Sequence, residues 1–365
     1  MTQNSSRVDF HIHSEYSSDG VLSPREVIEL AKANNVSHIA IADHNTLAAN
    51  VELWESVGAP LNAPMISIDG VNIISAVEVT CRVDDVLNKD GDTTKVHLLV
   101  YGADMSPNSP LVKLLKLKSK NDRDCDFGFL NYFLKQHKGH NITEQDIKDY
   151  ISEKREKIPG YSSMSSTDVR EFMFRHGITL ATSNKQYRKL LKSAPHYNRL
   201  DISAKDLIDI AHASGGLVVG AHLSTNLKRT NDKLGLLTTL FTYGIDGIER
   251  LFNGSTPKGR KLFSRAVMLT KPENQIIYTA GSDTHNLTRG NTIGKWNITE
   301  NILKKYFGGL IREIELLSKA RKNGKITNRK YPKIHASDIN DCLTEYSVTA
   351  QNLMYVPDGS VMGDD

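Results

Sequence analysis

Two pairs of side chains in this chain have the spacing that metal binding requires. His11 and His13 stand two residues apart at the end of an apolar run, and Asp283 and His285 repeat that spacing much later. On a β-strand, residues i and i+2 project from the same face, so both members of a pair can reach one ion. The two pairs therefore predict a metal site built from imidazole and carboxylate groups.

Further metal-competent side chains stand at or near the ends of other apolar runs. Each one alone is explained equally well by a structural hydrogen bond, because short motifs have high false-positive rates. Their convergence favours a site, since parallel α/β folds build their sites at one rim of the sheet. The additional candidates are Asp19, His44, Glu78, His97 and His222, while Glu249 is expected only to order its loop and His38, His212 and His335 fit no pattern.

The types of ligand narrow the chemistry. Imidazole and carboxylate without thiolate suit Zn, Mn or Fe rather than a cysteine-rich structural zinc site. Nine candidate ligands are too many for one ion, so we infer a cluster of two or three divalent ions. Such a cluster can activate water and stabilise both oxygens of a phosphoester displacement. The chain contains no GxSxG elbow and no P-loop, so neither serine hydrolysis nor NTP-driven chemistry is indicated.

The elements that must position these residues are short β-branched runs separated by helix-like stretches. Near-continuous apolar runs are typical of strands covered on both faces. Strand–helix–strand repetition predicts an α/β fold with a parallel sheet, closed or nearly closed, wrapped by helices. The expected strands are Val8–His13, His38–Asp43, Ile73–Thr80, Val96–Tyr101, Leu217–His222, Gly247–Phe252 and Ile276–Ala280.

Helix signals divide the rest of the chain. Ser23, Pro24 and Glu26 form a capping box with proline at the first helical position, and Ser203 is expected to cap a second helix. Residues 104–201 read as helices and polar loops without a convincing strand. We therefore predict an α/β body over residues 1–103 and 202–300, a helical insertion over 104–201, and a helical extension and tail over 301–365.

The composition sets broad limits on what the protein is. With 365 residues, 39% apolar and 24% charged, the chain has the balance of a globular protein rather than a disordered or fibrous one. No apolar run approaches the ~20 residues of a membrane helix, and no secretory signal is visible. The three cysteines form no disulfide framework, so we expect a cytoplasmic protein. The net charge of +4 does not by itself indicate nucleic-acid binding, and no obligate protein partner is evident.

The motifs taken in order resemble the PHP (polymerase and histidinol phosphatase) superfamily. HIH, SSDG, ADHNT, AVEVT, KVHLLVYG, SGGLVVGAH and GSDTH follow one another from His11 to His285 as they do in that superfamily. The resemblance implies a distorted seven-stranded PHP barrel and a site for three metal ions. Carried over position by position, its ligands are His11, His13, Asp19, His44, Glu78, His97, His222, Asp283 and His285.

The resemblance also distributes these ligands among the ions. It implies one ion held by the His11–His13 pair with Glu78 and Asp283, and a second held by Glu78 with two further histidines, His97 and His222. Asp19, His44 and His285 would hold the third ion.

Within the superfamily, the chain is most similar to stand-alone phosphoesterases: AMP and nucleotide phosphatases and a TrpH-like 5′–3′ exonuclease. That branch has a helical insertion at the same place, which implies that residues 104–201 cap the substrate. Its basic element resembles Asn121-Asp122-Arg123, which makes Arg123 a candidate phosphate-binding residue. A solvated helix charge explains Arg123 equally well. His196 stands where the branch has tyrosine, and is a second candidate for substrate contact.

Together these observations predict a metal-dependent phosphoesterase. We expect it to hydrolyse phosphate esters of nucleotides or short oligonucleotides by a metal-bound hydroxide, as a phosphatase or a 5′–3′ exonuclease. Asp43, beside a ligand, is expected to orient a metal-bound histidine or to carry a proton. The alternatives are a histidinol-phosphatase-like phosphomonoesterase and a non-catalytic binding module stabilised by its metals.

Overall fold

The computed structural model describes most of the chain as two compact units. The described residues are 7–17, 19–136, 142–157, 166–179, 186, 189–190, 193, 199–251, 276–287, 292–296, 298, 308–325 and 336–352. The first unit comprises Met1–Lys113 with Asp201–Cys342, and the second comprises Leu114–Leu200 with Leu343–Asp365.

The first unit is built on one curved sheet. Seven strands follow one another by hydrogen bonding in the order β1-β2-β4-β5-β7-β8-β9, and β3 and β6 pair with β4 off this path. The strands are β1 (Arg7–Ile12), β2 (Val36–Ile41), β3 (Met65–Ile68), β4 (Val71–Leu87), β5 (Thr93–Tyr101), β6 (Ile202–Ser203), β7 (Leu217–Ala221), β8 (Gly247–Leu251) and β9 (Ile277–Ala280). β3 and β6 were not anticipated from the sequence.

The two ends of this path meet, which makes the sheet a nearly closed barrel. The chain leaving β9 returns to the end of β1, where the amide of Asp283 donates to the carbonyl of His11 at 2.9 Å. Two residues further along, the amide of His13 donates to the carbonyl of Thr284 at 3.0 Å. The predicted seven-stranded barrel is therefore confirmed.

The expectation of an all-parallel sheet is wrong at one strand. β5 runs antiparallel to both of its neighbours, β4 and β7, whereas the other pairs along the path are parallel. The cause is the short link between β4 and β5. Asn88 accepts from the amides of Asp90 and Asp92 at 2.8 and 3.1 Å, and Gly91 has a φ of +83°. A connection this short joins antiparallel strands, because a parallel crossover needs about a dozen residues or more.

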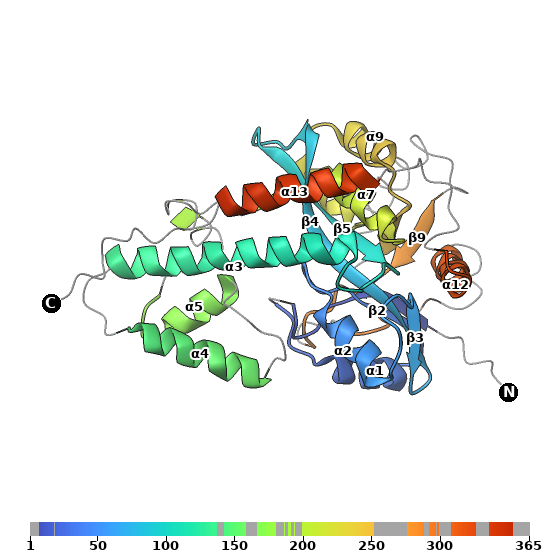
Figure 1. Cartoon of the computed structure of the whole chain (residues 1–365), viewed down its shortest axis with the longest axis horizontal. Coiled ribbons are helices and arrows are strands. Elements are labelled where there is room, and N and C mark those ends of the chain that lie inside the picture. The colour runs from blue at the N-terminus through green and yellow to red at the C-terminus, as the bar shows by residue number, and fades with distance from the viewer. Residues whose placement is uncertain are drawn as a thin grey trace. The chain divides into compact units, whose positions relative to one another are not determined.

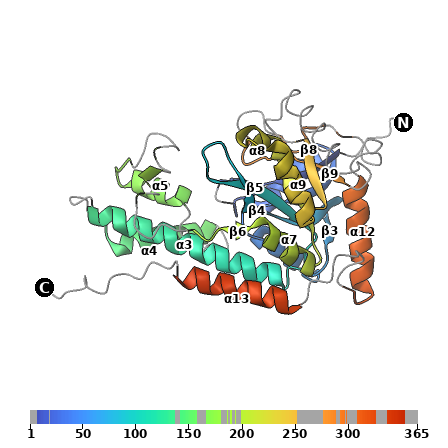
Figure 2. The same ribbon diagram turned by 90° about the horizontal axis from the view of Figure 1, so that it is seen from above.

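Helices cover the outside of this barrel (Figures 1 and 2). α1 packs on β2, α7 packs on β4, β5 and β7, and α12 packs on β9. At the start of α1, Ser23 and Glu26 form the predicted capping box. Ser203 stands at the start of α7 as predicted, but its side chain makes no capping hydrogen bond. In the described part of the chain, the helices that lie wholly within this unit are α1 (Pro24–Ala33), α2 (Ala48–Ser56), α7 (Ala204–Ala213), α8 (Leu223–Arg229), α9 (Lys233–Tyr243) and α12 (Gly308–Lys322).

The barrel strands are apolar on both faces because both faces are covered. Phe10, Ile12, Ile41, Ile73 and Leu98 are fully buried. Each such side chain contributes roughly 1.5–3 kcal/mol to folding through burial. The polar side chains that interrupt these runs at one rim are held in place by this packing.

The second unit is helical in its described part and has its own apolar core. It contains most of α3 (Pro110–Gln136), α4 (Glu144–Lys157), α5 (Ser166–Arg175) and the later part of α13 (Ala336–Asn352). Phe129, Phe133, Tyr150 and Phe172 are buried together in this core. Among the described residues between 104 and 201 there is no strand, as expected from the sequence. None of the helices described here is long and apolar enough to cross a membrane.

Candidate metal centre

The first predicted pair of histidines lies in the buried part of the site. His11 lies in β1 and His13 follows that strand directly, and both imidazoles are fully buried. Their Nε2 atoms lie 3.1 Å apart. A side chain at position 281 would prevent this placement, because a Cβ on Gly281 would lie 2.1 Å from the Cβ of His11. Glycine at this position therefore lets the chain after β9 pass close to His11.

Glu78 of β4 lies at the centre of the candidate site. Its Oε2 lies 3.3 Å from His11 Nε2 and 3.4 Å from His13 Nε2. On the other side, His44 Nδ1 lies 3.0 Å from the same oxygen. Its Oε1 faces two more imidazoles, at 2.9 Å from His97 Nδ1 and 3.0 Å from His222 Nε2. One carboxylate therefore touches five of the predicted histidine ligands.

The donor atoms around Glu78 fit a divalent metal ion. The nitrogens of His11 and His13 and the Oε2 of Glu78 form a triangle with sides of 3.1, 3.3 and 3.4 Å. Ligand atoms bound tetrahedrally at about 2.0–2.1 Å from zinc lie about 3.3–3.4 Å apart, so the triangle has the size of one tetrahedral face. Among the described residues, Oε2 of Glu78 is buried and makes no hydrogen bond. A buried carboxylate oxygen that faces three imidazole nitrogens but accepts no hydrogen bond from them is costly unless a cation compensates it.

The second predicted pair reaches the same place from the chain after β9. Asp283 Oδ1 lies 3.6 Å from His11 Nε2 and 3.3 Å from His13 Nε2. The backbone of Asp283 has a φ of +52°, in the left-handed region that non-glycine residues rarely adopt. His285 Nε2 lies 3.2 Å from the same Asp283 oxygen. Backbone strain of this kind persists only where surrounding contacts hold it. Here the hydrogen bond from the amide of Asp283 to the carbonyl of His11 is such a contact.

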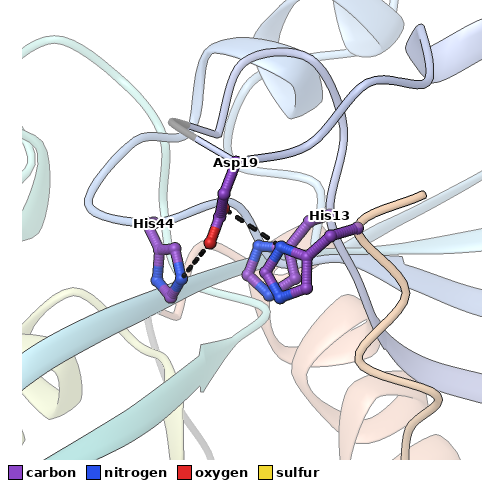
Figure 3. Close-up of side chains that lie close together, drawn as sticks. His13, Asp19 and His44 are labelled. Atoms are coloured by element: carbon purple, nitrogen blue, oxygen red, sulfur yellow. Dashed lines mark ion pairs between the residues drawn. The ribbon is translucent and has the colours of Figure 1, made fainter. Parts of the chain in front are cut away.

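A further group of ligand atoms forms beside the first. Figure 3 shows Asp19, His13 and His44 with their side chains directed toward one another. Asp19 Oδ1 lies 3.0 Å from His285 Nδ1, and Asp19 Oδ2 lies 3.7 Å from His44 Nε2. One atom from each of these four residues falls within 4.8 Å of the others. Two more such groups are His11, His13 and Glu78, and His44, Glu78 and His97.

The electrostatics keep the carboxylates of this site ionised. Although burial opposes its charge, Glu78 has a pKa well below the usual range because of the surrounding His11, His44 and His97. Burial also opposes the charge of Asp283, but His11, His13 and His285 lower its pKa as well. Burial lowers the pKa of His44 to about 4, so this imidazole is neutral near neutral pH. Although burial opposes their charge, the carboxylates raise the pKa of four other imidazoles, and the pKa of His285 reaches about 10; the histidines with a raised pKa are His11, His13, His222 and His285. Because metal binds the neutral imidazole, these histidines must release a proton when they bind metal.

Asp43 lies behind the ligands and binds the loop after β1. Its Oδ1 accepts from the amide of Ser14 at 2.6 Å, and its Oδ2 accepts from the hydroxyl of Ser14 at 2.7 Å. Asp43 is fully buried and precedes His44. Through Ser14 it fixes the backbone next to His13, so its contacts act on ligand position through the chain.

Two residues contact the candidate ligands in ways that the sequence motifs do not indicate. Ser17, which belongs to none of these candidate ligand patterns, contacts His13, Asp19 and the backbone of His44. Glu249, expected only to order its loop, contacts His11 and the backbone of His222. The spacing HIHSEYS could have indicated Ser17 only with knowledge of how the loop turns back.

Two other histidines, His38 and His212, lie outside this cluster, and the substrate candidates fall among the side chains that the structure does not describe. His212 pairs with Asp246 at 3.0 Å, and His38 lies between Ser37 and Asn72, so both have the structural roles expected of them. Arg123 belongs to α3, but its side chain lies outside the described residues. His196 and His335 also lie outside them.

The fold is a nearly closed barrel whose rim carries imidazole and carboxylate groups that could hold metal ions. A family model, the PHP domain, matches residues 9–356, and the chain belongs to that family. A comparison with curated proteins gave no match.

Two solved structures share the fold. One is a protein from Bifidobacterium adolescentis proposed to be a metal-dependent phosphoesterase, with 21% identity and a TM-score of 0.58 over 82% of this chain and 95% of that one. The other is an amidohydrolase from Chromobacterium violaceum, solved with sulfate and without metal, with 20% identity and a TM-score of 0.57 over 85% and 96% of the two chains.

Proposed function

We propose that the chain is a hydrolase that cleaves phosphate esters of nucleotides or short oligonucleotides, using divalent metal ions held by nine residues. The nine are the predicted set: His11, His13, Asp19, His44, Glu78, His97, His222, Asp283 and His285. The observation that carries the proposal is the position of Glu78, whose two oxygens lie within 2.9–3.4 Å of five imidazole nitrogens. A structural salt bridge needs one partner for a carboxylate, not five.

The arrangement supports two or three ions rather than one. The three groups of ligand atoms overlap at His13, His44 and Glu78. Shared ligands of this kind hold neighbouring ions about 3.5–4 Å apart in two-metal hydrolases. Glu78 is the residue suited to bridging, because each of its oxygens faces a different set of imidazoles. The set of nitrogen and oxygen donors suits Mn, Zn or Fe.

Bound divalent ions supply Lewis acidity and a hydroxide nucleophile near neutral pH, which is the chemistry that phosphoester hydrolysis needs. The residues of this chain supply the geometry. Buried His11, His13 and Glu78 fix the inner face of the site. Asp19, His44 and His285 are partly exposed and lie on its accessible side. Asp43 holds the loop that joins the two sides through Ser14.

Substrate binding is assigned to the helical insertion. By resemblance to the nucleotide-phosphatase branch, residues 104–201 form a substrate cap and Arg123 grips a phosphate oxygen, with His196 as a second contact. Arginine suits this role because its guanidinium binds phosphate in a bidentate manner.

The proposal is tested by the turnover of a phosphoester panel with Mn-, Zn- and Fe-loaded protein. The panel contains p-nitrophenyl phosphate, AMP, a nucleoside 3′,5′-bisphosphate and a 5′-phosphorylated oligonucleotide. We expect phosphate release from at least one nucleotide substrate. In the D283N variant the rate should fall by more than about 100-fold, because losing a ligand should cost more than the about 10–100-fold that is lost with a ligand's hydrogen-bond partner. Stepwise release of mononucleotides from the oligonucleotide would identify an exonuclease.

The matched control is D69N. Asp69 lies in the turn between β3 and β4, well before Glu78 in the middle of β4, and pairs with exposed Arg25. Its loss should leave turnover unchanged. Metal-loaded protein that hydrolyses nothing in the panel would overturn the enzymatic proposal and favour the metal-stabilised binding module.

A further inference from the structure

Two imidazoles of the candidate centre each make a hydrogen bond through the ring nitrogen that faces away from Glu78. His11 Nδ1 lies 3.0 Å from Glu249 Oε1, and both side chains are fully buried. His13 Nδ1 lies 3.2 Å from the hydroxyl of Ser17. In both rings it is therefore the other nitrogen, Nε2, that faces Glu78 and Asp283.

The partners of Glu249 determine which nitrogen of His11 carries the proton. Its second oxygen, Oε2, accepts from the backbone amide of His222 at 2.9 Å. An ionised carboxylate only accepts hydrogen bonds, so His11 must donate from Nδ1. The neutral ring then has a free lone pair at Nε2, which is the atom that lies 3.1 Å from the Nε2 of His13.

The surroundings of Ser17 lead to the same result for His13. The Ser17 hydroxyl can donate one hydrogen bond and accept two. The hydroxyl donates to Asp19 Oδ1 at 3.1 Å, because an ionised carboxylate can only accept. It also accepts a hydrogen bond from the backbone amide of His44 at 3.2 Å. The remaining lone pair faces His13 Nδ1, so that nitrogen must be the donor.

We propose that Glu249 and Ser17 are positioning residues that hold His11 and His13 in the Nδ1–H tautomer, so that both Nε2 atoms are presented to one metal ion. This inference rests on the proposed function, because it concerns residues assigned there as ligands. Outer hydrogen bonds of this kind are general at metal-binding histidines, where their loss costs about 10–100-fold in metal affinity. Glu249 also joins two ligands from different strands, since one of its oxygens holds the ring of His11 and the other holds the backbone of His222.

The variant E249Q separates this role from simple packing. It keeps the size of the side chain, but replaces one accepting oxygen with an NH2 group that only donates. The backbone amide of His222 cannot change from donor to acceptor, so the remaining oxygen must serve it. The NH2 group then faces His11 Nδ1 and favours the tautomer with the proton on Nε2, which leaves Nε2 without a lone pair for a metal ion.

A matched control exists elsewhere in the same barrel unit. Asp246 also accepts from an imidazole and from a backbone amide, His212 Nε2 at 3.0 Å and the amide of Val218 at 2.7 Å. This pair is buried like His11 and Glu249, but neither member belongs to a group of candidate ligands. The D246N variant therefore reproduces the loss of a buried carboxylate without touching the centre.

The test is a titration of the metal-stripped full chain with Co(II), followed by calorimetry and by the visible absorption of the bound ion. We expect E249Q to bind its tightest ion about 10–100-fold more weakly than the wild type and with an altered absorption spectrum. The S17A variant should also have a lower affinity for that ion. D246N should lower the unfolding temperature while leaving Co(II) affinity and spectrum unchanged.

The outcomes separate this inference from the proposed function. Wild-type protein that binds no Co(II) would overturn the ligand assignment and the inference together. Wild-type protein that binds Co(II), with E249Q and S17A indistinguishable from it, would overturn the inference alone. If E249Q does not fold, S17A decides, because removing a hydroxyl leaves the carboxylate core intact.

Discussion

At the scale of residues, the site depends on how closely the chain after β9 approaches β1. Gly281 is the point of closest approach, because a Cβ there would lie 2.1 Å from His11 Cβ and 2.6 Å from Glu249 Oε1. Separations this short exceed what side-chain adjustment can absorb, so any larger residue must displace His11, Glu249 or the backbone between them.

We therefore expect G281A to damage metal binding as well as stability. Displacement of the His11 ring should lower the affinity for the most tightly bound ion. Overpacking should lower the free energy of unfolding by about 1–3 kcal/mol. Urea unfolding of the metal-free chain measures the second effect, and Co(II) titration measures the first. G58A is the control, since a Cβ on Gly58 meets nothing within 4 Å although its φ of +65° adds some strain. Normal Co(II) affinity in G281A would contradict this account of the glycine.

The candidate ligands could be found from the sequence, but the residues that hydrogen-bond to them could not. The pair spacing of His11 with His13 and of Asp283 with His285 is a local pattern, so it can be found without a structure. Ser17 reaches His13 only because the loop between them turns back, and Glu249 reaches His11 from a strand more than 200 positions away, at a separation of 238. Contacts of this kind are fixed by tertiary packing and leave no local signal.

At the scale of elements, β5 shows how a missed turn changes a topology. The apolar patterns of Ile73–Thr80 and Val96–Tyr101 were recognised, but both strands extend well beyond them, to Leu87 and from Thr93. The remaining link contains Asp90-Gly91, a strong turn signal whose importance appears only when the strands are given their full length. Because β5 runs antiparallel to β4, His97 in the middle of β5 pairs with Thr80 of β4, and its imidazole reaches Glu78.

Helix α12 is held to the barrel unit by a basic side chain near its end. Basic residues in a run such as the one that begins at Arg321 are usually solvated. Instead, the Arg321 guanidinium donates to the backbone carbonyls of Asn62 and Gly102 at 2.6 and 2.7 Å, and to that of Gly215 at 3.2 Å. This side chain fastens α12 to loops of the barrel unit and satisfies carbonyls that would otherwise need water.

We expect R321M to destabilise the barrel unit without affecting its chemistry. Hydrogen bonds from charged groups contribute about 1.5–3 kcal/mol each, so the free energy of unfolding should fall by about 2 kcal/mol or more. Thermal or urea unfolding measures this, and metal content should be unchanged. K319A serves as the control because Lys319 is exposed on the same helix. Equal stability of R321M and K319A would show that the carbonyl contacts contribute nothing.

At the scale of the whole molecule, the chain combines a barrel that carries the ligands with a helical unit that has a separate core. The barrel was predictable because its strands are apolar on both faces and end in recognisable motifs. The helical character of the described part of the second unit was also predictable, because residues 104–201 contain no convincing strand pattern. Substrate contacts are harder to predict because they require only a few exposed side chains, and a charged helix residue such as Arg123 has the same sequence pattern whether or not it binds phosphate.

The most direct test of the central claim is a count of the metal ions held by the metal-stripped chain after equilibration with Zn or Mn and dialysis, in the wild type and in E78Q. We expect two or three ions per wild-type chain, because the candidate ligand atoms form three overlapping groups. E78Q should lose every ion that depends on the shared carboxylate and should lose phosphoester turnover with them. A wild-type chain that retains no metal, or an E78Q chain that retains as many ions as the wild type, would contradict the claim that Glu78 stands at the centre of a metal cluster.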